Sequence, residues 1–308
     1  MYTGGWPFPD GIEHVQLYSA GVKLITGFRI EMIALVSGYV FAYQSVKLNK
    51  KYDFWIFLKK KFNRLVIPGL IFSLVYYFCF QFNKPALGSF RWFVELSSGF
   101  GHLWFLPMLF WCFLAIWIID RYSFPSKWLF PILAILSVVK FPDLPLGFSK
   151  VFHFAFYCYL GYLMQLYKNE LLERYAHVKY ILVLWMSYLL LVWCSAWLAD
   201  FEGYTILKNI LSLLVACNGI FAMYFLVCKC IDKADFVLKD WVIGASSVCY
   251  GVYVYHQFIL WCLYYHTPVP QMLGTYILPW CGLGIALPLS ILLTKLSLRT
   301  KIGRFLIG

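Results

Sequence analysis

The most evident shortage in this chain is charge. Only 13% of its 308 residues are charged, and Asp and Glu together number 14, whereas about 25% of the residues in an ordinary soluble domain are charged. Hydrophobic residues make up 62% of the sequence, and the mean hydropathy is +0.73. One soluble core cannot hide so much apolar surface, so the composition excludes a disordered chain or an ordinary soluble enzyme and predicts a multi-pass membrane protein.

Patterns typical of metal sites and disulfide frameworks are also missing. The chain has ten cysteines, most of them inside apolar runs, and the closest pair, Cys228 and Cys230, is separated by only one residue. Such cysteines are typical of small apolar packing residues, so we expect neither a metal site nor a disulfide. Residues 1–14 have no basic region and no apolar region, so we expect no signal peptide there.

Long apolar runs are what the sequence has in abundance. A helix needs about 20 apolar residues to cross a bilayer, and backbone groups in lipid must be paired within the segment, which favours helices over strands. We predict an all-α polytopic transmembrane helix bundle of about nine spans, with residues 1–23 as an external segment and residues 24–308 as one membrane domain. The predicted spans are residues 24–45, 66–82, 103–119, 128–140, 151–167, 180–199, 205–228, 244–265 and 274–296.

The charge that is present is mainly basic. Lys and Arg number 26 and the formal net charge is +12, which in a soluble protein suggests nucleic acid as a partner. Here little soluble surface remains, so we expect no nucleic acid and interpret the excess as basic cytoplasmic segments. If segment 46–65 is cytoplasmic and the spans alternate, most basic residues fall on the inner side. This places the C-terminus in the cytoplasm and, with nine spans, the N-terminus outside.

Five ionisable side chains fall within the predicted spans or at their outer ends, where such groups are costly and often mark functional cavities. Four of them have a simpler interpretation, because a side chain near a helix end can extend to the membrane surface. The fifth, His256, lies near the middle of its span, where its alternative is a structural hydrogen bond to another helix. The five residues are Arg29, Glu31, His102, His153 and His256.

Four short patterns surround these side chains. They are Phe28-Arg29-Ile30-Glu31 with a later Ser37-Gly38-Tyr39-Val40-Phe41, then Lys61, Arg64 and Pro68 at the start of a span, then His102-Leu103-Trp104-Phe105-Leu106, and last Ser247, Tyr250, Tyr253 and His256. In these patterns, in their order and in its basic tail, the chain resembles the acyltransferase 3 family of bacterial membrane acyltransferases over residues 24–308. The His-Leu-Trp-Phe-Leu segment is the most specific of the four.

The resemblance implies an enzyme that transfers an acyl group, commonly acetyl from acetyl-CoA, to a hydroxyl group of an envelope glycan or lipid-linked sugar. It implies the bacterial cytoplasmic (inner) membrane as location, and a donor substrate but no permanently bound cofactor. At the inner side we expect the basic residues to hold donor phosphates; these are Lys60, Lys61 and Arg64. Toward the outer side we expect His256 to act as base and the other two residues to orient the acceptor or stabilise charge; these are His102 and Arg29.

The chain departs from the family in two ways. Lys61 replaces an Arg, which keeps the charge but loses the planar fork that binds phosphate through two hydrogen bonds. In addition, the family's first helix, which carries an Arg and a His usually taken as catalytic, has no counterpart in this sequence. We therefore expect little or no activity from the 308 residues alone. An inactive relic of the enzyme is one alternative, and a transporter or flippase of a lipid-linked sugar is another.

The charge asymmetry yields a test of topology. We predict that Lys59 and Gly308 are cytoplasmic and that Ser89 and Thr267 are external, because basic residues concentrate on the side that is not translocated. Labelling of single cysteines at these four positions with a membrane-impermeant reagent measures this. Reaction of position 89 or 267 from the cytoplasmic side contradicts the orientation.

Overall fold

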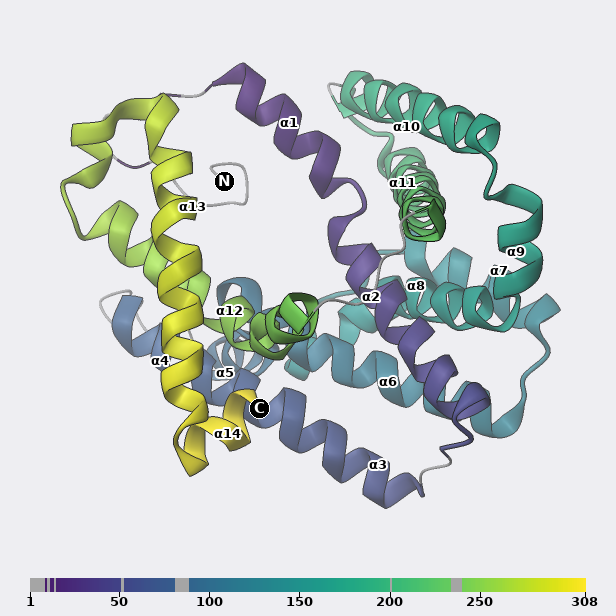
Figure 1. The fold of residues 1–308 in the computed structure, drawn as a ribbon, viewed down its shortest axis with the longest axis horizontal. Coiled ribbons are helices and arrows are strands. Elements are labelled where there is room, and N and C mark those ends of the chain that lie inside the picture. The colour runs from purple at the N-terminus through teal and green to yellow at the C-terminus, as the bar shows by residue number, and fades with distance from the viewer. Residues whose placement is uncertain are drawn as a thin grey trace.

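The chain is described by a computed structural model that covers residues 9, 12–13, 15–50, 53–80, 89–199, 201–233 and 240–308. Every regular element of these residues is a helix (Figure 1). The α-helices are α1 (Gln16–Thr26), α2 (Arg29–Ala42), α3 (Phe54–Lys61), α4 (Ile67–Phe80), α5 (Ser89–Ser98), α6 (Phe105–Tyr122), α7 (Ser126–Val138), α8 (Phe148–Leu166), α9 (Lys168–Tyr175), α10 (Val178–Ala199), α11 (Thr205–Lys233), α12 (Asp240–Tyr265), α13 (Val269–Leu298) and α14 (Lys301–Ile307). Four short elements complete the order: the π-helices η1 (Tyr43–Lys47) and η2 (Phe62–Val66), and the 3₁₀ helices η3 (Gly101–Trp104) and η4 (Pro145–Gly147).

The fold is an all-α polytopic bundle, as the apolar runs predicted, and each of the nine predicted spans overlaps a helix. Among the described residues, six segments are long and apolar enough to cross a membrane. Helices α7, α8 and α12, which match the fourth, fifth and eighth predicted spans, are not among the six, so the number of spans stays a prediction. The six segments are Gln16–Lys47, Phe54–Phe80, Gly101–Tyr122, Val178–Ala199, Thr205–Cys230 and Val269–Leu298.

The basic segment before α4 is helical. Asp53 begins α3 because its side chain accepts a hydrogen bond from the backbone N–H of Trp55 at 3.1 Å, as an N-cap residue does. Helix α3 continues through η2 into α4 and forms one apolar segment, Phe54–Phe80. The three basic residues therefore lie in helices and not in the loop that their charge suggested. They are Lys60, Lys61 and Arg64.

Helix α10 shows how the bundle meets lipid. Its large apolar side chains at intervals of three or four residues are exposed, which defines a stripe on one face of the helix. Exposure of such a stripe to water would be unfavourable, whereas the hydrocarbon interior of a bilayer accommodates it. The stripe consists of Leu182, Met186, Leu189, Leu190, Trp193 and Trp197.

Helix α8 lies inside the bundle, where it packs against α2, α6 and α7. Residues 154–161 are all buried, so this helix is covered by protein on every side. Its closest partner is α2: a Cβ added at Gly38 would overlap the carbonyl oxygen of Cys158, and one added at Gly161 would overlap that of Leu35. The two glycines let the backbones approach, as small residues do between membrane helices.

This close crossing yields a prediction. Gly38→Ala forces α2 and α8 apart, and overpacking of this kind costs about 1–3 kcal/mol or more of folding free energy. We expect a lower midpoint of thermal unfolding in detergent. Gly284→Ala in α13 is the matched control, because a Cβ there enters open space. Equal midpoints for the two variants would show that the α2–α8 contact is loose.

Candidate functional site

Two side chains of α12 hold the backbone of His102 in η3. The Gln257 Oε1 atom accepts a hydrogen bond of 2.9 Å from the His102 backbone N–H, and the Tyr253 hydroxyl donates to the His102 carbonyl. Gly101 has φ +58°, and a Cβ there would lie 3.3 Å from the same Gln257 oxygen. Glycine thus permits both the left-handed backbone and the close approach of α12.

This arrangement brings the two predicted histidines together. The ring centroids of His102 and His256 are 5.0 Å apart, with an interplanar angle of 70°. The two ring nitrogens of His102 are buried and make no hydrogen bond within the described part of the chain. The sequence placed His102 at the outer end of a span and His256 at mid-depth, whereas the folded helices give them one common site.

The hydrogen bonds of His256 define which ring nitrogen can act as a base. Its Nδ1 atom lies 3.0 Å from the carbonyl oxygen of Val252 and 2.8 Å from that of Tyr253. Carbonyl oxygens only accept, so Nδ1 carries the proton and Nε2 has the free lone pair. This tautomer presents an acceptor nitrogen to a ligand, which is the form that general-base chemistry requires.

Arg29, the third residue predicted for this site, is the first residue of α2 and is exposed. Its charge acts on the His256 ring, so the two side chains are within electrostatic range of each other. The site therefore combines side chains from three elements that are far apart in the sequence, namely α2, η3 and α12. A cation that interacts with His256 can stabilise negative charge that develops on a bound group.

The three basic residues predicted to bind phosphate form a second group, at the junction of α3 and η2. Lys61 has its Nζ atom 3.4 Å from the ring centroid of Phe113, a cation–π contact. Lys60 and Arg64 both act electrostatically on Lys61. The like charges of this group repel one another, and a bound anion would relieve that repulsion.

One face of α12 connects the basic group with the histidines. The Tyr250 hydroxyl donates to the carbonyl oxygen of Arg64 at 3.1 Å. Tyr253, three residues further along, contacts His102, and His256 follows after another three. Residues at this spacing share a helix face, and six residues of α-helix rise about 9 Å. Tyr250 and His256 thus lie about 9 Å apart along the axis of α12.

The other two ionisable residues noted in the sequence form a separate pair. Glu31 Oε1 lies 3.8 Å from His153 Nε2, and His153 Nδ1 lies 2.8 Å from the carbonyl oxygen of Ser137. The second carboxylate oxygen of Glu31 is buried without a hydrogen-bond partner in the described residues, as is the hydroxyl of Tyr157. This pair joins α2, α7 and α8 and takes no part in the contact between the histidines.

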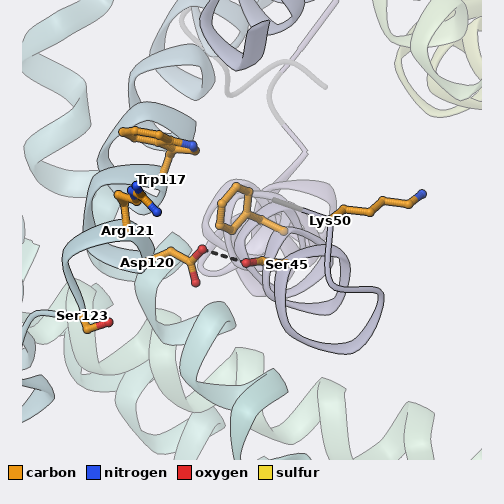
Figure 2. A pocket seen from close by; sticks show the side chains of 7 residues that line it. Ser45, Lys50, Trp117, Asp120, Arg121 and Ser123 are labelled. Atoms are coloured by element: carbon orange, nitrogen blue, oxygen red, sulfur yellow. Dashed lines mark hydrogen bonds between the residues drawn. The ribbon is translucent and has the colours of Figure 1, made fainter. Parts of the chain in front are cut away.

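Sequence reasoning did not single out Gln257 or the residues of one pocket. Gln257 could have been found, because it lies four residues after Tyr253 and so shares its helix face. A pocket of about 220 Å³ between η1 and the end of α6 had no such signal, since its residues come from separate segments (Figure 2). It is lined by Phe41, Ser45, Lys50, Trp117, Asp120, Arg121 and Ser123.

These features define a class of protein: a helical, multi-pass membrane protein in which two histidines from separate helices meet beside polar side chains. The model of the family described as "Acyltransferase domain", the acyltransferase 3 family, matches residues 1–296. The chain belongs to this family and is a membrane acyltransferase. It matches neither a curated protein nor a solved structure.

Proposed function

We propose that the chain transfers an acyl group, specifically acetyl, from acetyl-CoA to a hydroxyl group of an envelope glycan or a lipid-linked sugar. The bacterial inner membrane is its proposed location, with the C-terminus in the cytoplasm. The observation that supports this most is the face of α12 that contacts both the basic group at Arg64 and His102. A donor with phosphates at one end and a thioester at the other suits two such groups along one helix face.

This proposal replaces the expectation of little or no activity from the 308 residues alone: His256 is the general base, in place of the histidine on the family's first helix. Its Nε2 atom takes the proton of the acceptor hydroxyl, and the oxygen attacks the carbonyl carbon of the thioester. The negative charge on the carbonyl oxygen of the tetrahedral intermediate is stabilised by Arg29 and by a ring N–H of His102. The C–S bond then breaks, and the His256 imidazolium returns the proton to the sulfur, which gives an ester and free coenzyme A.

The donor would bind from the cytoplasm, where acyl-CoA is made available to membrane enzymes of this kind. Arg64 is exposed and lies next to the Tyr250 contact, so its guanidinium is available to a phosphate. Lys61 is half-buried against aromatic rings, which fixes its amine near the same place. The acceptor would approach the histidines from the external side.

The base assignment is tested by replacing His256 with Gln, which keeps a polar side chain but cannot take up the proton. We expect the rate of acetyl transfer in proteoliposomes to fall roughly 10²–10⁴-fold, the usual effect of losing a positioned base. His266→Gln, an exposed histidine just after α12, is the control and should keep the full rate. A His256→Gln enzyme with an unchanged rate would remove His256 from the mechanism.

The donor assignment is tested by Arg64→Ala. A phosphate then loses a hydrogen bond to a charged donor, an interaction of roughly 1.5–3 kcal/mol, so the Kd for acetyl-CoA should rise roughly 10- to 150-fold. Lys47→Ala is the control, because Lys47 is also exposed and basic but lies in η1, on the far side of α3 in the sequence. If both variants show equal, small changes in the Kd for acetyl-CoA, Arg64 serves only to orient the chain in the membrane.

A further inference from the structure

The pocket of Figure 2 belongs to neither group described above. At its centre Asp120 accepts two hydrogen bonds of 2.7 Å, one from the Ser45 hydroxyl and one from the Tyr162 hydroxyl. These bonds fix the carboxylate, and its remaining lone pairs can still accept a donor from a ligand. The pocket thus contains a rigid, oriented acceptor at the end of α6.

Two more side chains of α6 line the same pocket. Trp117 and Arg121 are one helical turn apart, so they share a face of α6. In Figure 2 the ammonium group of Lys50 points away from Asp120, which leaves Arg121 as the cation closer to the pocket's centre. An indole, a guanidinium and a fixed carboxylate therefore surround one cavity of about 220 Å³.

This cavity is in contact with the structure around the basic group. The ring of Phe57 in α3 lies 6.4 Å from that of Trp117 and 5.8 Å from that of Phe41, both of which line the pocket. On the same helix, the Nζ atom of Lys61 lies 5.6 Å from the Phe57 ring. The pocket and the basic group thus both contact the ring of Phe57.

We propose that this pocket binds the adenine nucleotide end of the acyl-CoA donor, an inference that rests on the proposed function. The purine ring packs against Trp117, its exocyclic amine donates to Asp120, and a phosphate pairs with Arg121. Pockets that enclose a whole drug-sized ligand measure about 300–1,000 Å³, so one of this size holds only a part of the donor. The diphosphate then lies at Lys61 and Arg64, and the thioester extends along α12 toward His256.

The test compares two donors, acetyl-CoA and S-acetylpantetheine, which lacks the nucleotide. Arg121→Gln should raise the KM for acetyl-CoA about tenfold, because an exposed charge-assisted contact is lost, and leave the KM for S-acetylpantetheine unchanged. Trp117→Leu should act in the same way. Arg174→Gln and Trp128→Leu are matched controls, since both residues are exposed and lie outside the pocket.

A direct binding measurement covers the case in which Trp117→Leu fails to fold. Adenosine 3′,5′-bisphosphate should bind the wild-type protein and compete with acetyl-CoA, and Arg121→Gln should weaken this binding by the same factor. The titration is made in nanodiscs with and without anionic lipid, because lipid headgroups also carry phosphate. If the nucleotide binds in nanodiscs without anionic lipid but not in nanodiscs with it, the pocket binds lipid headgroups. That result would overturn the proposal.

The two proposals fail in different ways. If neither donor supports acetyl transfer by the wild-type protein, the proposed function is wrong. If both donors support transfer and Arg121→Gln changes their KM values equally or not at all, the function stands and the nucleotide pocket is wrong. A rise in KM for acetyl-CoA alone in the Arg121→Gln variant supports both the proposed function and the nucleotide pocket.

Discussion

The candidate site depends on the contact between α12 and η3. Gln257 and Tyr253 bind the N–H and the carbonyl of one residue, His102, so the start of α6 is held in register with the middle of α12. Because His256 lies between Tyr253 and Gln257 on α12, the same contact sets the distance between the two imidazoles. In a bilayer an unpaired backbone group is costly, which makes these two hydrogen bonds a strong constraint on the packing.

A second constraint places Arg29 near that site. Gly38 and Gly161 let α2 and α8 pack backbone to backbone, and α8 is itself covered by α6, the helix that η3 begins. The first turn of α2 is therefore positioned relative to α6 through the buried helix between them. The ring nitrogens of His102 are buried and the apolar stripe of α10 is exposed, as a membrane bundle with an internal site requires.

Helix positions could be predicted from the sequence because the length of an apolar run is a local property. Helix α3 was expected as a loop because its three consecutive lysines resemble a cytoplasmic connection, although Asp53 is a clear N-cap. The separate site residues could be named as unusual polar groups, but the contact between His102 and His256 depends on helix packing, which the sequence does not show. The same holds for the pocket at Asp120, whose residues come from separate segments.

The central claim is that the polar site of this bundle performs acyl transfer. The most direct measurement uses purified protein in proteoliposomes with acetyl-CoA labelled in the acetyl group and a lipid-linked sugar as acceptor. We expect label to appear in an ester of the sugar while free coenzyme A accumulates in equal amount. Movement of unlabelled sugar across the membrane, with acetyl-CoA unconsumed, would contradict it and identify a transporter.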